Sequence, residues 1–356
     1  ATEKLPVRTL RRVIKAALDV GLDQIVEFMP NTVLERQGLI DLRTAISKIH
    51  FPDSDLELNS ARRRLAFDEL ILIQLSVLKR RKDWQTGSRG IPLVSNSNST
   101  TKFIDSLPFE LTGAQRRVIS ELTKDLSQKK PMIRLLQGDV GSGKTVVAAV
   151  ALLKAVDSGF QGALMAPTEL LAEQHFLTLI SLLSKTSDKV SEHESFVELQ
   201  FPAKQFIRIA LLTGSLRKSV KDKLGKLISN NEIHIIVGTH ALIQSSIDIN
   251  NLAVGIVDEQ HRFGVMQRSS LADRPVKPHI LSMSATPIPR SLALTLYGDS
   301  DISILDEMPV GRKTVKTRWI AHDQRSAAYE FVKQELNDGH QAFIVFPLIE
   351  ESEVVN

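Results

Sequence analysis

Several features are absent from this sequence of 356 residues, and each absence removes a class of structure. The chain contains no cysteine, which excludes a disulfide framework and a thiolate metal site and fits a reducing compartment. No apolar stretch approaches the roughly 20 residues of a membrane span, and the N-terminus shows no secretory signal pattern. The nine histidines are scattered without metal-ligand spacing. What remains is an ordinary globular composition, with 42% hydrophobic and 24% charged residues.

Positive charge is concentrated in the first third of the chain. Residues 1–105 contain 17 Lys and Arg against 13 Asp and Glu, whereas the remainder is balanced, and the net charge is +4. Two basic clusters stand out, Arg62–Arg64 and Lys79–Lys82. Such runs are more often solvated helix faces than binding sites, and they are compatible with contact to a phosphate backbone.

A glycine-rich segment at residues 137–145 reads Gln-Gly-Asp-Val-Gly-Ser-Gly-Lys-Thr and lies between two apolar runs. It matches the phosphate-loop pattern G-x-x-x-x-G-K-[ST] in the required strand–loop–helix context, which disfavours a plain glycine-rich turn. Backbone N–H groups would curl around phosphate oxygens, Lys144 would reach the β- and γ-phosphates, and Thr145 would ligate Mg²⁺. The predicted ATP-binding residues of this loop are Gly138, Asp139, Gly141, Ser142, Gly143, Lys144 and Thr145.

Two other segments would complete a nucleotide site. Before the first strand, the amide of Gln115 suits bidentate recognition of adenine and favours ATP over GTP, although a plain surface helix residue is the alternative. About 115 residues after the loop, the apolar strand Leu252–Val257 delivers Asp258 and Glu259 at its end, where open α/β sheets bind ligands. Asp258 would hold Mg²⁺ together with Thr145, and Glu259 would deprotonate the attacking water. That chemistry indicates a hydrolase rather than a kinase.

Other strand ends carry small hydroxyl residues or glycine. Singly each would be an unremarkable turn, but together they can line one face of the sheet with phosphate donors. Hydroxyls near residue 284 would also sense the metal site and relay occupancy by the γ-phosphate. The predicted DNA-binding and coupling residues are Pro167, Thr168, Glu169, Gly214, Thr239, His240, Ser284, Ala285 and Thr286.

The apolar patterns divide the chain into four parts. Residues 1–85 are predicted to be helical, and residues 86–105, rich in Gly, Ser and Asn, to be a flexible linker. Residues 106–310 alternate strands and helices, which predicts an α/β fold with a parallel, doubly wound sheet. Residues 311–356 begin a second such pattern. Strands are expected at 133–137, 163–166, 207–212, 233–237, 252–257, 279–284, 314–320 and 341–348, helices at 9–22, 39–49, 60–84 and 324–337 and from near 112, 144, 169 and 219, and a loop at 185–202.

Taken together, these motifs resemble the RecG family of branched-DNA translocases within superfamily two. The strings that carry the resemblance are QGDVGSGKT, LMAPTELLAEQH, VGTHALIQ, VDEQHRFGVMQR and SATPIPRSL. The transcription-repair coupling factor is the alternative, but it typically reads Asp-Glu-Glu-Gln where this chain has Asp258-Glu259-Gln260-His261. Residues 1–105 also resemble RecG, in the helical stretch that follows its wedge domain.

The resemblance implies an ATP-driven motor that regresses stalled forks and remodels Holliday junctions in DNA recombination and repair. It implies a RecA-like first domain at 106–310, an incomplete second RecA-like domain at 311–356, and ATP and Mg²⁺ as cofactors. It also assigns Lys144, Asp258, Glu259, Gln260 and His261 to catalysis. Lys144 and Thr145 would hold phosphate and Mg²⁺, Asp258 and Glu259 would act on the metal and the water, and Gln260 and His261 would couple these steps. Branched double-stranded DNA is the expected partner, single-stranded-DNA-binding protein a further one, and a monomer the expected state.

The wedge domain and the later helicase motifs are missing, and the chain begins at Ala1 rather than at Met. We therefore expect a fragment with little or no activity of its own, from a bacterial cytoplasm or, alternatively, a plastid or mitochondrion. Two other functions stay open. A non-catalytic branched-DNA binding module would carry a vestigial ATPase, which intact Lys144 and Asp258 disfavour. An RNA helicase is disfavoured because the acidic motif is not Asp-Glu-Ala-Asp.

Overall fold

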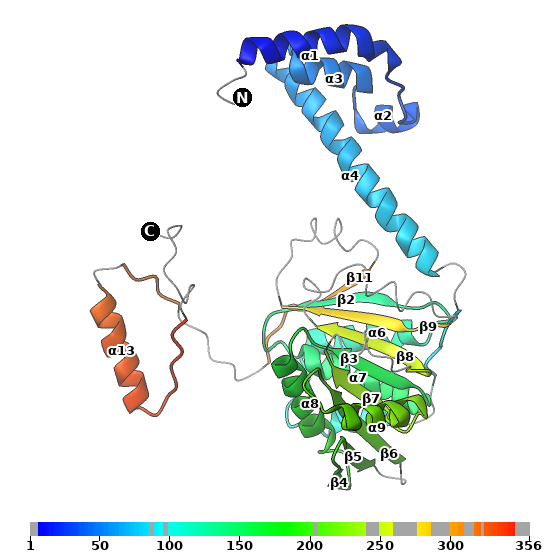
Figure 1. Ribbon diagram of the computed structural model, residues 1–356, viewed down its shortest axis with the longest axis vertical. Helices are drawn as coiled ribbons and strands as arrows, with labels where there is room; N and C mark the ends of the chain where they lie inside the picture. Colours follow the sequence, from blue (N-terminus) through cyan, green and yellow to red (C-terminus); the bar gives the residue numbers. More distant parts are fainter. Residues whose placement is uncertain are drawn as a thin grey trace. The chain divides into compact units, whose positions relative to one another are not determined.

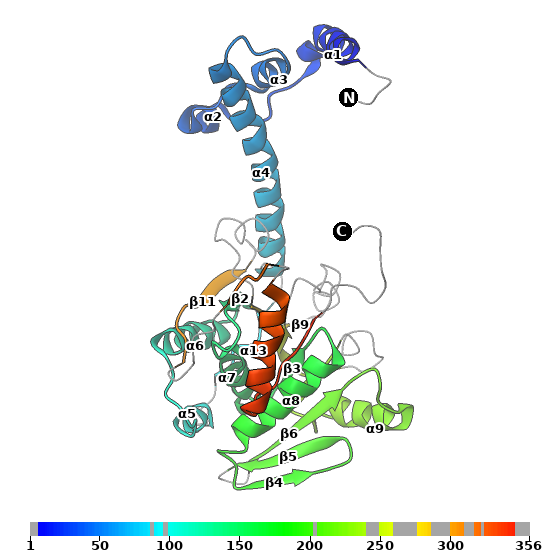
Figure 2. The same ribbon diagram turned by 90° about the vertical axis from the view of Figure 1, so that its left-hand side faces the viewer.

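A computed structural model describes residues 6–85, 89–94, 99–201, 205–239, 249–258, 276–285, 300–309, 317–321 and 324–345 (Figures 1 and 2). The chain divides into two compact units, Ala1–Pro309 and Val310–Asn356. The first unit contains a helical region and a large sheet with its covering helices, and the second contains one described helix. Among the described helices, none is both long and apolar enough to cross a membrane.

The N-terminal region is helical, as predicted. It consists of α1 (Val7–Gly21), the short 3-10 helix η1 (Leu22–Gln24), α2 (Asn31–Gln37), α3 (Leu42–His50) and α4 (Asp55–Gln85). The three predicted helices are confirmed as α1, α3 and α4, whereas α2 was not predicted. This helix has only seven residues and ends at Gly38, whose φ of 59° is left-handed. So short an element gives almost no helical periodicity in the sequence.

A buried guanidinium joins the helices of this region. The Arg64 side chain is fully buried on α4 and donates to Oε1 and Oε2 of Glu27 at 2.7 and 3.1 Å, and to Oδ1 of Asp68 at 2.9 Å. Glu27 also accepts hydrogen bonds from the backbone N–H groups of Met29 and Leu42, both at 2.8 Å. The Arg64 contacts, above all, lower the pKa of Glu27 from 4.5 to about 2.

The second part of the first unit is a nine-stranded sheet in the order β11-β2-β10-β8-β3-β7-β6-β5-β4. All neighbouring strands from β11 to β6 pair in parallel, and β6, β5 and β4 pair antiparallel at the other end. The predicted parallel α/β fold is thereby confirmed. The strands are β2 (Ile133–Gly138), β3 (Gln161–Met165), β4 (Lys189–Glu192), β5 (Phe196–Phe201), β6 (Gln205–Leu212), β7 (Ile235–Gly238), β8 (Leu252–Asp258), β10 (His279–Ser284) and β11 (Asp301–Leu305).

Both faces of the sheet are covered (Figure 1). Along β3, Leu164 belongs to one apolar cluster while Ala163 and Met165 belong to another, as expected where successive side chains point to opposite faces. The larger cluster includes side chains of α6 (Gly113–Leu126), α7 (Lys144–Asp157) and α8 (Glu169–Leu183), and the smaller one those of α9 (Lys218–Ser229). Two-sided burial explains why these strands appear in the sequence as nearly continuous apolar runs.

The predicted loop at 185–202 is wrong, because most of it forms the hairpin of β4 and β5. In β5, Val197, Leu199 and Phe201 are buried while the residues between them are only partly buried. This alternation of apolar and polar residues is a strand signal. The alternating stretch in β5 is short and lies among charged residues. The polar composition of the whole segment therefore predicted a loop instead of a strand. The strand β11 was likewise missed.

The predicted flexible linker at 86–105 is also wrong for its described residues. The short strand β1 (Arg89–Gly90) pairs with β9 (Val276–Lys277), and α5 (Ser99–Asp105) buries Phe103 completely. Buried His279 accepts the Met132 N–H at Nδ1 and donates from Nε2 to the Ile91 carbonyl at 2.7 Å, which fastens this segment to the sheet. Composition predicted a linker because a few anchoring apolar residues stand among many polar ones.

The second unit contains α13 (Arg325–Asn337), which confirms the predicted helix. The strands predicted at 314–320 and 341–348 are not seen in their described parts, residues 317–320 and 341–345. There Phe343 and Val345 are each 87% exposed. A strand needs a hydrogen-bonded neighbour, and nothing in the described part of this unit supplies one.

Candidate nucleotide-binding and nucleic-acid-binding site

The phosphate loop and Asp258 lie at the same edge of the sheet. In the parallel ladder, Met283 of β10 is level with Leu136 of β2 on one side and with Asp258 of β8 on the other. Two strand spacings, about 10 Å, therefore separate the backbones of Leu136 and Asp258. The phosphate loop begins two residues beyond Leu136, at the carboxyl end where parallel sheets bind ligands.

The loop between β2 and α7 is shaped by its glycines. Gly141 and Gly143 have φ values of 81° and 87°, which side chains with a Cβ rarely adopt. A Cβ on Gly143 would lie 2.2 Å from Nε2 of Gln115, and one on Gly138 would lie 2.5 Å from Oγ of Ser142. The loop therefore has no room for side chains at Gly138 and Gly143.

The residues of the loop fit a bound triphosphate. The Lys144 ammonium group bends back over the loop and donates to the carbonyls of Gly138 and Asp139 at 2.7 and 3.0 Å. Oγ of Ser142 is one of three buried side-chain N or O atoms in the described part of the chain that have no hydrogen-bond partner. An ammonium group, an orphaned hydroxyl and a glycine cradle at a helix N-terminus suit phosphate oxygens. Thr145, the predicted ligand of Mg²⁺, is partly buried in the first turn of α7.

The amide of Gln115, predicted to recognise adenine, makes two hydrogen bonds within the protein. Its Oε1 accepts the Thr112 N–H at 2.9 Å in a capping box at the start of α6, and its Nε2 donates to the Ser142 carbonyl at 2.8 Å. The side chain is only 1% exposed, so a bidentate contact to adenine would require it to leave both partners. In this structure, Gln115 supports the phosphate loop through its hydrogen bond to the Ser142 carbonyl.

Asp258 has a partner that the sequence reasoning missed. Its Oδ2 lies 2.7 Å from Nε2 of His175, which is on α8, and both side chains are largely buried. Asp258 itself could be predicted as a site residue, because it follows a short apolar strand. A histidine 83 positions earlier gives no comparable signal, because only the packing of α8 against the sheet brings the two together.

The predicted nucleic-acid residues gather where β3 and β6 end. The Thr168 hydroxyl caps α8 by accepting the Leu171 N–H at 3.3 Å. The neighbouring Glu169 carboxylate accepts the Ser215 N–H at 3.0 Å, and hydrogen bonds from Ser215, above all, lower the pKa of Glu169. A Cβ on Gly214 would lie 2.9 Å from the same carboxylate, so this glycine allows the close approach.

The remaining predicted residues lie along the same edge or outside the described part of the chain. Thr239 follows β7 and donates from its backbone N–H to the Leu212 carbonyl at 3.4 Å. Ser284 is buried at the end of β10, and Ala285 follows it. Pro167 is partly buried immediately before Thr168. Outside the described residues lie His240, Glu259, Gln260, His261 and Thr286.

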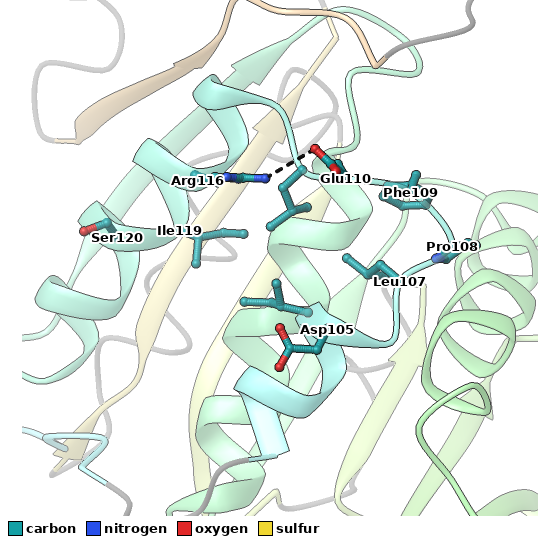
Figure 3. Close-up of a pocket in the computed structure, with 10 residues that line it drawn as sticks. Asp105, Leu107, Pro108, Phe109, Glu110, Arg116, Ile119 and Ser120 are labelled. Atoms are coloured by element: carbon teal, nitrogen blue, oxygen red, sulfur yellow. Dashed lines mark ion pairs between the residues drawn. The ribbon is translucent and has the colours of Figure 1, made fainter.

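A pocket of about 890 Å³ lies beside the start of α6 (Figure 3). The ring of Phe109 is 41% exposed, and Arg116 lies 3.9 Å from Glu110 in an ion pair. Leu111 lines the pocket, and Gln115, four residues later, bonds to the phosphate loop. Its lining residues are Ile104, Asp105, Leu107, Pro108, Phe109, Glu110, Leu111, Arg116, Ile119 and Ser120.

Residues 112–295, which contain both halves of this site, match the DEAD/DEAH box helicase family. The chain belongs to this family. It is 42% identical over 352 residues to the ATP-dependent DNA helicase RecG of Synechocystis sp., covering 99% of this chain and 40% of the relative. To the protein of the same name from Bacillus subtilis it is 43% identical over 351 residues, covering 99% of this chain and 49% of the relative.

Among solved structures, the chain is similar to one described as RecG bound to a three-way DNA junction. The TM-score is 0.78 at 40% identity, over 97% of this chain and 44% of the other. The predicted resemblance to the RecG family and the RecA-like helicase fold are thus confirmed. The chain spans about half or less of the length of these relatives.

Proposed function

We propose that the protein containing this chain hydrolyses ATP to move along and remodel branched double-stranded DNA, in recombination and repair. One observation carries the proposal: the phosphate loop around Lys144 and the carboxylate of Asp258 lie two strands apart at one sheet edge. The relatives named ATP-dependent DNA helicase and the similar structure bound to a three-way junction support the substrate class.

Different residues of the site are proposed to bind the phosphates, hold the metal and accept a proton. The N–H groups of the loop and the Lys144 ammonium group bind the β- and γ-phosphates and neutralise their charge. To do so, Lys144 would exchange its two carbonyl partners for phosphate oxygens. Thr145 and Asp258 would hold Mg²⁺, which when bound offsets charge on the phosphates. Glu259, directly after Asp258 in the sequence, is proposed as the base that takes the proton of the attacking water.

The pocket beside α6 is the proposed site for the base of the nucleotide. Its exposed Phe109 ring offers a stacking surface, and the ion-paired Arg116 and Glu110 offer polar groups (Figure 3). This assignment replaces the direct role predicted for Gln115. If it holds, Phe109→Ala raises the KM for ATP more than it lowers kcat, because stacking contributes to binding and not to the reacting centre.

DNA is proposed to bind where the strands β3, β6 and β7 end. Thr168 and Thr239 carry hydroxyl groups at this edge, and the N-terminus of α8 adds its partial positive charge. Contacts of this kind hold a backbone phosphate without reading the base. They therefore suit a protein that recognises the shape of a junction rather than a sequence.

The longer protein is proposed to place a wedge domain before residues 1–85, a first RecA-like domain at 106–310 and a second that opens at 311–356. The relatives, which extend well beyond the matched region, support this arrangement. We retain single-stranded-DNA-binding protein as a proposed partner, a monomer as the proposed state and a bacterial cytoplasm as the proposed compartment.

ATP hydrolysis by the full-length protein tests the proposal. We expect forked DNA to stimulate the rate more than linear duplex or RNA does. We expect Lys144→Ala to lower kcat by roughly 10²–10³-fold, the usual loss when a group stabilising transition-state charge is removed. Lys154→Ala, at the far end of the same helix, is the matched control.

The outcomes separate the alternatives. An unchanged rate in Lys144→Ala contradicts a motor and leaves a DNA-binding module with a vestigial ATPase. Equal stimulation by linear and forked duplex favours a translocase like the transcription-repair coupling factor. Stronger stimulation by RNA than by DNA favours an RNA helicase.

A further inference from the structure

The hydrogen bond between His175 and Asp258 links two parts of the proposed site. Asp258 is 8% exposed, so its charged carboxylate needs donors from the protein. His175 Nε2 lies 2.7 Å from Oδ2. Because a carboxylate only accepts hydrogen bonds, Nε2 carries the proton and donates it. This arrangement occupies one oxygen of the carboxylate, Oδ2.

The helix that carries His175 is held at its N-terminus by the proposed DNA-binding edge. Thr168, the N-cap of α8, precedes His175 by seven residues, which is two helical turns and about 10 Å. Glu169 ties this end to the backbone of Ser215 at 3.0 Å. Ala172 and Leu179 are fully buried on the same side of α8 as His175, so the helix cannot turn without disturbing the core.

We infer that His175 is a positioning residue: it fixes the Asp258 carboxylate for the metal and, through α8, links that carboxylate to the strand ends that bind DNA. This inference rests on the proposed function, because it assumes that Asp258 serves the metal and that Thr168 lies at the DNA edge. Groups that hold a metal-binding carboxylate matter nearly as much as the ligand itself. A shift of the N-terminus of α8 on DNA binding would move the donor that orients Asp258.

Two polar substitutions of different reach test the inference in the full-length protein. His175→Gln keeps an N–H donor near the position of Nε2, whereas the side chain of His175→Asn is too short to reach Asp258. Both retain polarity at a site where the His175 side chain is 14% exposed, so neither is expected to prevent folding. The exposed Thr178, on the same helix, provides the matched control Thr178→Ala.

The readouts are kcat, the KM for ATP and the Mg²⁺ concentration at half-maximal rate, with and without forked DNA. The Mg²⁺ dependence of binding of a non-hydrolysable ATP analogue is a further readout that involves no turnover. We expect His175→Asn to lower kcat or to raise the Mg²⁺ requirement by about 10–100-fold, with little change in KM. His175→Gln should recover most of the loss, and Thr178→Ala should match the wild type. DNA-stimulated hydrolysis should fall by a larger factor than basal hydrolysis.

Three results would overturn the inference. The first is a His175→Asn protein within twofold of the wild type in both kcat and Mg²⁺ requirement. The second is a His175→Gln protein as impaired as His175→Asn, since the hydrogen bond would then not be what matters. The third is an equal fall in basal and DNA-stimulated rates, which would remove the link to the DNA edge.

Asp258→Asn, measured in parallel, separates failure of the inference from failure of the proposed function. If Asp258→Asn leaves ATP hydrolysis unchanged, Asp258 does not serve a catalytic metal and the proposed function fails. If Asp258→Asn abolishes hydrolysis while His175→Asn does not affect it, only the role of His175 is wrong.

Discussion

The helical region and the sheet of the first unit are stabilised by different forces. Among the described side chains of residues 6–83, five apolar ones are buried, and the largest fully buried side chain is that of Arg64. In the sheet, two continuous apolar clusters fill both faces. The buried apolar side chains of the helical region are Met29, Leu34, Ala45, Ala61 and Val77.

The difference shows where each kind of core is useful. An ion cluster specifies which helix meets which, but removing one partner leaves an uncompensated buried charge. An apolar core stabilises in proportion to buried area and leaves the polar strand ends available for chemistry. The proposed site accordingly lies at the edge of the apolar sheet. In the helical region, by contrast, the charges of Arg64 and Glu27 neutralise each other in an ion pair.

The largest effect is expected from a cavity in the apolar core. Leu152 of α7 is fully buried, and a Cβ added to Gly162 on β3 would lie 2.5 Å from its Cδ2, so the packing there is close. Leu152→Ala should lower the free energy of unfolding by about 2–5 kcal/mol. Leu75→Ala, at a residue of α4 that is 54% exposed, should change it by less than about 0.5 kcal/mol. Denaturant unfolding measures both, and equal losses would contradict an apolar sheet core.

The ion cluster should respond next most strongly. Arg64→Met leaves the carboxylates of Glu27 and Asp68 without their main partner. We expect a loss near the lower end of the roughly 3–5 kcal/mol seen for broken buried pairs, because the Glu27 side chain is 26% exposed. Arg62→Met, at an exposed neighbour, is the control. Hydrogen exchange should show the loss of protection in residues 6–85. An equal loss of protection over the sheet would contradict the claim that the two regions are stabilised separately.

Acid should weaken the two regions in different pH ranges. Burial lowers the pKa of His279 and of His234 below 6.5, so the folded sheet disfavours their protonation. Because the unfolded chain then binds more protons, sheet stability should fall as the pH drops below about 6.5. Glu27, whose pKa is lowered from 4.5 to about 2, contributes stability that is complete above 4.5 and lost between 4.5 and about 2.

Unfolding free energies measured across pH in two variants test these ranges. His279→Gln should reduce the slope of the profile that begins below about pH 6.5, and Glu27→Gln should reduce the slope only below pH 4.5. A Glu27→Gln protein that differs from the wild type in slope near pH 6 would contradict the assignment.

The smallest effects are expected at two helix caps, one in each region. Asp41 accepts the Thr44 N–H at 3.0 Å at the start of α3, and Thr112 accepts the Gln115 N–H at 3.1 Å at the start of α6. Replacement of either by Ala should cost about 1 kcal/mol of stability. Only Thr112→Ala should also raise the KM for ATP, because Gln115 supports the phosphate loop. Equal KM values in the two variants would show that this support is dispensable.

The sequence predicted the sheet well because its strands are buried on both faces, which produces apolar runs such as Leu252–Val257 between helical patterns. It also located Lys144 and Asp258, since each stands at a strand end marked by such a run. Long-range packing was less visible. The alternation in Phe196–Phe201 was hidden by charged neighbours, and Phe103 and His279 anchor a segment whose composition indicated a linker.

Side-chain roles that depend on tertiary contacts could not be predicted at all. Nothing local to Gln115 shows that its amide meets the Ser142 carbonyl 27 residues later. His175 reaches Asp258 only because α8 packs against the sheet. The sequence therefore predicts the chemical groups of the proposed site, while the structure was needed to find the residues that contact them.

A structure of the full-length protein with Mg²⁺ and a non-hydrolysable ATP analogue tests the central claim most directly. We predict one Mg²⁺ about 2.1 Å from Oγ1 of Thr145, with the Asp258 carboxylate bound to it directly or through one of its water ligands. A triphosphate held by the loop around Lys144, with its metal beyond the reach of Asp258 even through a water, would contradict the proposed function.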